Sequence, residues 1–171
     1  ELALERTDGR VRAGKTISPS FLFAALLWKL VDKRWQATVA KGEHSIQALM
    51  EAADSVMDEQ TQKLAIQRRY QSDMREIWFM QPRFERANGK TIWRLIEQPR
   101  FRAAVDFLQL RAEAREVDSV QAQWWMDLAN ADDGERAEMI ETYMQQNKAA
   151  ANPAKRRRRP RRNPGAGTTP A

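Results

Sequence analysis

The segment FLFAALLW, Phe21–Trp28, is the longest apolar run in the chain and largely decides the fold. Lys29 ends the run, and a membrane-spanning helix needs about 20 apolar residues, so the segment is too short to cross a bilayer. Ser18 and Pro19 precede it and provide a helix N-cap followed by proline at the first helical position. The sequence therefore predicts a helix from about Pro19 to Ala40 whose first half, apolar on nearly every side, lies at the centre of a hydrophobic core.

The apolar pattern of the following residues is also helical. The chain has only seven glycines and seven prolines, and no alternating Val/Ile/Thr stretch has the length of a strand. A second helix is expected from Ser45, with one apolar stripe that runs from Ile46 through Met50 to Met57. Further helices are expected over residues 68–81, 91–97, 99–112, 117–128 and 134–146, and Pro82 is expected to end the first of these. The sequence therefore predicts an all-α fold, a helical bundle of five to seven helices.

The positive charge of the chain is concentrated at its C-terminal end. Residues 151–171 hold seven cations and no acid, whereas the first 150 residues hold 22 basic and 23 acidic side chains. The residues after Asn147 include no large apolar side chain, so they cannot offset the cost in chain entropy and are expected to be disordered. The predicted organisation is a linker over residues 1–17, a helical domain over 18–147 and a disordered basic tail over 148–171. The cations of the tail are Lys155, Arg156, Arg157, Arg158, Arg159, Arg161 and Arg162.

No catalytic or metal-binding constellation is recognisable in the sequence. The chain has no cysteine and a single histidine, His44, which is interpreted as a solvated loop residue. Asp132 and Asp133 could be a pair of metal carboxylates, but they are better explained as the N-cap of a helix. Trp124 and Trp125 could stack on bases, although core packing is favoured for at least one of the two rings. No signal peptide opens the sequence, so we expect a soluble intracellular protein.

Two stretches of the helical domain carry clustered basic residues. Residues 83–102 interleave six cations with Phe84, Trp93 and Phe101, a combination that suits single-stranded nucleic acid, where cations pair with phosphates and aromatic rings stack on bases. The alternative is that the rings belong to the core and the cations form a solvated face. The second stretch, QRRY (Gln67–Tyr70), begins a predicted helix and could hold Arg68 and Arg69 toward a phosphate. The alternative is that the two are ordinary surface arginines. The candidate RNA-binding residues of the two stretches are Arg68, Arg69, Arg83, Arg86, Lys90, Arg94, Arg100 and Arg102.

Three stretches together resemble the C-terminal part of bacterial poly(A) polymerases, members of the nucleotidyltransferase superfamily related to the CCA-adding enzymes. They are ISPSFLFAALLW (Ile17–Trp28), LAIQRRYQSDMREIWFMQPRFERANGK (Leu64–Lys90) and WRLIEQPRFRAAVDFLQLRAE (Trp93–Glu113). A Trp-Trp pair and an arginine-rich tail follow in the order of the family, and the resemblance covers about residues 10–162. One departure is Gln67, which stands where the family usually has proline, so the start of the following helix could differ.

The resemblance implies an RNA-binding region of an enzyme that adds adenosines from ATP to RNA 3′ ends and so promotes RNA decay in the bacterial cytoplasm. The active site of the family lies in an N-terminal head whose paired aspartates hold Mg²⁺, and no catalytic residue can be carried over to this sequence. ATP and Mg²⁺ are therefore expected in the head, with single-stranded RNA 3′ ends and possible RNA-decay proteins as partners of the enzyme. The main alternative is a stand-alone RNA-binding adaptor. A CCA-adding relative is less consistent with the long basic tail. A nuclear-import segment is less consistent with the resemblance to a bacterial family.

Overall fold

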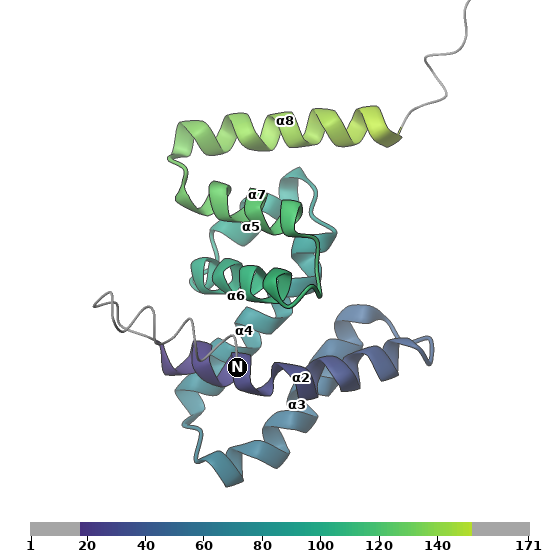
Figure 1. Ribbon diagram of the computed structural model, residues 1–171, viewed down its shortest axis with the longest axis vertical. Helices are drawn as coiled ribbons and strands as arrows, with labels where there is room; N and C mark the ends of the chain where they lie inside the picture. Colours follow the sequence, from purple (N-terminus) through teal and green to yellow (C-terminus); the bar gives the residue numbers. More distant parts are fainter. Residues whose placement is uncertain (1–17, 152–171) are drawn as a thin grey trace, which may run out of the picture.

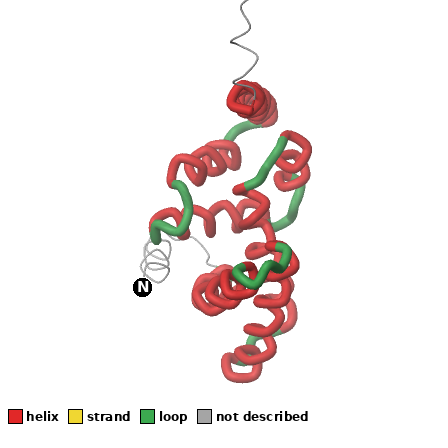
Figure 2. The backbone as a smooth tube through the Cα atoms, turned by 90° about the vertical axis from the view of Figure 1, so that its right-hand side faces the viewer, coloured by secondary structure: helices red, strands yellow, loops and turns green. Residues whose placement is uncertain are grey.

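The computed structural model describes residues 18–151, and within this range every regular element is a helix, which confirms the all-α prediction (Figure 1). Figures 1 and 2 show α2 and α3 at one end of the molecule and α8 at the other, with α4 and α6 between them. Helices α5, α6 and α7 begin and end within two residues of the predicted positions. The seven helices are α2 (Pro19–Val39), α3 (Ser45–Leu64), α4 (Arg68–Glu85), α5 (Gly89–Ile96), α6 (Phe101–Glu113), α7 (Ser119–Asn130) and α8 (Asp133–Ala151).

The first hydrophobic core joins α2, α3 and the first half of α4. Trp28, Trp35 and Trp78 are buried in this core, and Phe107 of α6 packs against it. The indole N–H of Trp35 donates to the carbonyl of Ser45 at 2.8 Å, and that of Trp78 donates to the carbonyl of Ala24 at 3.2 Å. The polar edges of both rings are thus satisfied, as buried indoles require.

The prediction that the first half of α2 lies at the centre of the hydrophobic core is right for one side of the helix only. Leu27 and Trp28 are buried, but Leu26 is 50% exposed and Leu30 is 42% exposed. The reason is that α3, α4 and α6 cover one side of α2, and no described element covers the other. Met50 of α3, expected in the apolar stripe, is likewise 46% exposed.

A second hydrophobic core joins the end of α4 to α5, α6 and α7. Phe84 lies against Trp125, with ring centroids 4.7 Å apart, and Phe101 packs beside both rings. Trp125 is 1% exposed, which confirms the prediction that at least one ring of the Trp-Trp pair is a core residue. Ile140 of α8 completes this core.

Pro82 does not end the third predicted helix, because α4 continues through it to Glu85. Proline inside a helix costs about 3 kcal/mol, since it has no N–H to donate and its ring crowds the preceding turn. The continuation places Phe84 in the second core with no exposed surface, and truncating such a ring costs about 3–5 kcal/mol. In the same turn the side-chain amide of Gln81 donates to the carbonyls of Ile77, at 3.0 Å, and Ala104, at 3.1 Å. Burial and these hydrogen bonds therefore offset the cost of the proline.

Helix α8 starts as predicted and ends later than predicted. The Asp132 carboxylate accepts from the backbone N–H of Glu135 at 2.9 Å, and the Glu135 carboxylate accepts from that of Asp132 at 3.1 Å. This is a capping box, so the interpretation of Asp132 and Asp133 as a helix start is confirmed. The helix runs past Asn147 to Ala151, because Ala149–Ala151 are strong helix formers and Pro153 disfavours helix at the residue before it. The segments 1–17 and 152–171, predicted as a linker and as most of the tail, lie outside the described residues.

Candidate nucleic-acid interface

Four of the predicted RNA-binding cations lie close together in sequence around the turn from α4 to α5, and we call them the α4–α5 basic surface. It consists of Arg83 and Arg86 at the end of α4 and Lys90 and Arg94 on α5, and all four residues are exposed. None of the four side chains forms a hydrogen bond or an ion pair with another residue in the described range 18–151. Their charges are therefore available to an anion from solution.

The sequence of α5 directs part of this surface outward. The Asn88 side chain accepts from the backbone N–H of Thr91 at 3.2 Å and caps the helix. Ile92 and Leu95 are buried against the second core. Lys90, Trp93 and Arg94 follow the i, i+3, i+4 spacing of a single helix face, and all three are exposed. The helix thus presents two cations and an indole together.

The three aromatic residues of the stretch 83–102 have different environments. Phe84 and Phe101 are buried at 0% and 6% exposure, so for these two the interpretation as core residues is right. Trp93 is 43% exposed and is the one ring of the three that a base could reach.

Arg100 and Arg102, also predicted to bind RNA, are engaged within the protein. The Arg100 guanidinium pairs with Asp73 of α4 at 2.8 Å, and the Ser20 hydroxyl donates to the same carboxylate at 3.0 Å. Arg102 donates to the side chain of Asn130 and lies 3.7 Å from Asp106. These contacts tie the start of α6 to α2, α4 and α7, while the side chains of Arg100 and Arg102 remain 45% and 52% exposed.

Arg68 and Arg69 open α4 as the sequence predicts, but they lie apart from the α4–α5 basic surface. Fifteen residues of helix separate Arg68 from Arg83, which corresponds to about 22 Å along the axis. Both are exposed, and the Arg69 guanidinium lies over the ring of Tyr70 at 4.7 Å. Helix α4 begins at Arg68, directly after Gln67, whose φ of −65° is a value that proline also adopts.

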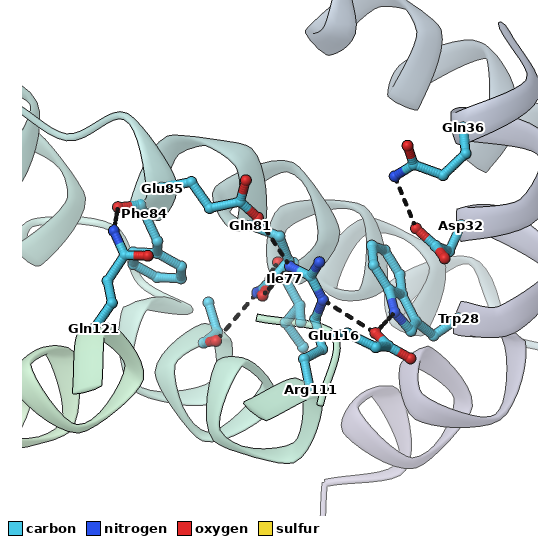
Figure 3. Close-up of polar contacts among 11 residues, drawn as sticks. Trp28, Asp32, Gln36, Ile77, Gln81, Phe84, Glu85, Arg111, Glu116 and Gln121 are labelled. Atoms are coloured by element: carbon cyan, nitrogen blue, oxygen red, sulfur yellow. Dashed lines mark hydrogen bonds and ion pairs between the residues drawn. The ribbon is translucent and has the colours of Figure 1, made fainter. Parts of the chain in front are cut away.

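Sequence reasoning missed a buried arginine at the centre of the fold. Arg111 of α6 is 5% exposed, and its guanidinium lies 4.8 Å from the Trp28 ring (Figure 3). It donates to the side-chain oxygen of Gln81 at 3.3 Å and to Glu116 at 3.4 Å, and the same Glu116 oxygen accepts from the Trp28 indole at 2.8 Å. The signal was available, because position 111 lies three residues after Leu108 and four after Phe107, on the core side of the helix. The cluster joins α2, α4 and α6, and it holds the end of α4 that carries Arg83.

Two further classes of site find no support within residues 18–151. No group of three or more His, Cys, Asp or Glu side chains is arranged to hold a metal ion. No helix in this range has the length and apolar content needed to span a membrane. His44 lies exposed at the N-cap of α3 and forms no side-chain cap hydrogen bond there. The tail cations Lys155–Arg162 lie outside the described residues.

An all-helical body with an unpaired basic surface, followed in the sequence by an arginine run, is typical of a protein that binds nucleic acid. Comparison with known families makes the assignment specific. The model of the family "Polymerase A arginine-rich C-terminus" matches residues 41–163, and the chain belongs to this family.

Curated relatives support the same assignment. Poly(A) polymerase I of Salmonella typhi is 37% identical over 161 residues, which cover 92% of this chain and 33% of that protein. Poly(A) polymerase I of Escherichia coli O6:H1 is 33% identical over 165 residues, covering 95% of this chain and 35% of that protein. The protein of the same name from Haemophilus influenzae is 33% identical over 164 residues. The chain therefore spans about a third of the length of the curated relatives it matches.

Proposed function

We propose that the chain is the RNA-binding C-terminal region of a bacterial polynucleotide adenylyltransferase, which adds poly(A) to RNA 3′ ends from ATP and promotes RNA decay. The observation that carries the proposal is the family match, because residues 41–163 include both the α4–α5 basic surface and the arginine run Lys155–Arg162. The names of the relatives describe polymerases that make poly(A), and a region shared with them serves that reaction most simply by holding the RNA.

The proposed role of the arginine run is to hold the RNA backbone. Arginine pairs with phosphate through two parallel hydrogen bonds, and a run without acids concentrates the positive charge. Pro160 and Pro164 favour an extended chain, along which the charges can follow a strand. Phosphate contacts carry no sequence information, so the run would raise affinity for RNA of any sequence.

The α4–α5 basic surface would provide a second, fixed contact to the same strand. Its four unpaired cations are held by α4 and α5, and the Gln81–Arg111 cluster fixes the end of α4. A rigid surface loses less conformational entropy on binding than a free chain does. The folded body would therefore orient an RNA that the tail has captured.

This proposal assigns catalysis to the N-terminal head that the family resemblance implies, because no catalytic motif of the family occurs in this sequence. In this proposal ATP and Mg²⁺ act in a catalytic head, the enzyme works in the cytoplasm, and RNA-decay proteins use its products.

The proposal is tested by two matched double variants of the 171-residue chain. Lys90→Gln with Arg94→Gln removes two unpaired cations from the α4–α5 basic surface, and Lys29→Gln with Lys33→Gln removes two exposed cations from α2. Binding of fluorescent single-stranded RNA is measured by anisotropy over a range of salt concentrations. The first variant should bind more weakly and lower the log–log salt slope by about 1.4, at about 0.7 per phosphate contact, and the second should match the wild type. Equal effects of the two variants, or no RNA binding by the wild-type chain, would contradict the proposal.

A further inference from the structure

Trp93 is the one exposed tryptophan of the chain. All six tryptophans lie within the described residues, and Trp28, Trp35, Trp78 and Trp125 are buried at 5% exposure or less. Trp124 is partly buried and stacks on Tyr143, with ring centroids 4.6 Å apart. Trp93 is 43% exposed. Part of the Trp93 ring is therefore accessible to a ligand from solution.

One side of Trp93 borders a shallow groove between α5 and α8. Ile140, Met144 and Gln145 of α8 line the groove with the indole, and its volume is about 290 Å³. Helix α8 lies close to the start of α5 because residue 89 is glycine, and a Cβ there would come within 2.2 Å of the Met144 sulfur. The groove is therefore formed by two closely packed helices and borders the indole.

The residues around Trp93 carry mostly positive charge. Lys90 lies one turn before it and Arg94 directly after it, and Arg83 and Arg86 precede them in the sequence. The one carboxylate in residues 83–94 is Glu85, which faces Arg111 at 3.7 Å. Two further carboxylates are near: Glu141 lines the groove, and Glu97 follows Trp93 by four residues on the same face of α5. In the proposed arrangement a bound strand would place its phosphates on Lys90 and Arg94 and one base against the indole.

A second groove with aromatic lining lies between α7 and α8. Trp124 and Tyr143 line it together with Asp127, Glu135 and Glu138. Three carboxylates would repel a phosphate backbone, so this site does not share the chemistry of Trp93.

We propose that Trp93 is a stacking platform for one unpaired base of single-stranded RNA, with the neighbouring phosphates held by the α4–α5 basic surface. The proposal rests on the function proposed above and assigns to the folded body a contact with bases rather than with phosphates alone. Stacking on an aromatic ring combined with cations along the backbone is the usual chemistry of single-strand binding. It tolerates any base, because every base has a π-face.

The connection of α8 to the arginine run fits this arrangement. Gln145 borders the Trp93 groove, and Ala151 ends the helix six residues later, about 9 Å along the axis. The run begins at Lys155, four residues beyond. The first cation of the run therefore lies ten residues after Gln145.

The test uses the full 171-residue chain with Trp93→Ala, Trp93→Leu and Trp93→Phe. Leucine preserves an apolar contact with Ile140 and Met144 but has no π-face, and phenylalanine restores a π-face. Each variant is titrated with labelled oligo(A) and with an abasic ribose-phosphate oligomer of the same length and charge. Far-UV circular dichroism and melting curves check that each variant is folded.

We expect the alanine and leucine variants to bind oligo(A) about five- to tenfold more weakly, and the phenylalanine variant to retain most of the affinity. All four proteins should bind the abasic oligomer equally. A leucine variant that binds oligo(A) like the wild type, or that loses affinity equally for both oligomers, would overturn the assignment and point to an apolar docking or packing role.

The outcome for the wild type separates the two proposals. If the wild type binds oligo(A) in a salt-dependent manner and all three Trp93 variants bind it with the same affinity, the stacking proposal is wrong and the proposed RNA-binding function stands. If the wild type does not bind oligo(A), both are wrong.

Discussion

Leu26 and Leu27 are neighbours in α2, and the structure predicts different consequences for the same truncation. Leu27 is 4% exposed and belongs to the core of α2, α3 and α4, whereas Leu26 is 50% exposed. Leu27→Ala and Leu26→Ala remove the same atoms from adjacent positions of one helix, and alanine favours helix at both. The difference between the two variants therefore reports burial.

The magnitudes follow from the exposed fractions. Leu27→Ala removes buried methyl and methylene groups and leaves a cavity, so the free energy of unfolding should fall by about 2–5 kcal/mol. Leu26→Ala removes about three carbons that are half in water, at about 0.8 kcal/mol for each fully buried CH₂, and leaves no cavity. We therefore expect a loss of about 1 kcal/mol or less for Leu26→Ala.

The assay is urea unfolding of each variant, followed by far-UV circular dichroism. An unchanged slope of free energy against urea would show that stability alone has changed. Equal losses for the two variants, or a larger loss for Leu26→Ala, would contradict the described packing of α2.

Three further predictions test other parts of the structure. Arg111→Ala should destabilise the fold by about 2 kcal/mol or more, since it leaves buried polar groups unpaired, and Arg111→Met should cost less in the same urea assay because it still covers Trp28. The hydrogen bond from Arg34 lowers the pKa of Glu59 below its ordinary 4.5. The Arg34–Glu59 pair therefore stabilises the fold above pH 4.5, and this stabilisation is lost as the pH falls through the lowered pKa of Glu59 in the folded protein. The difference in unfolding free energy between wild type and Glu59→Gln should accordingly shrink on acidification, and a constant difference would count against the pair. Deleting residues 152–171 should leave the melting temperature nearly unchanged, because the segment has no large apolar side chain; a large drop in calorimetry would show that it stabilises the helices.

Much of the fold could be predicted because helical periodicity and capping residues are local signals. The starts at Ser18-Pro19, Asn88 and Asp132 all occur within two residues of the expected positions. The predictions were wrong where tertiary contacts determine the structure. Proline alone disfavours a helix, but α4 continues past Pro82 because the continuation buries Phe84. Leu26 is apolar, but no described helix covers it.

The candidate site was predictable in composition but not in geometry. The sequence identified the cations of residues 83–102, but it did not separate Arg94, which is unpaired, from Arg100, which pairs with Asp73. Asp73 lies 27 residues away in the sequence, so this pairing has no local signal. The sequence spacing also did not show that Trp93 is exposed while Phe84 is buried, because both are large aromatic residues in helical segments.

The most direct test of the central claim is a salt titration of RNA binding by the full chain and by a chain that lacks residues 152–171. The deletion removes all seven cations of Lys155–Arg162 and leaves α8 intact. If about five of the seven cations contact phosphates, the log–log slope of affinity against salt should become shallower by about 3 to 4. Identical slopes for the two chains would show that the arginine run does not hold RNA and would contradict the account.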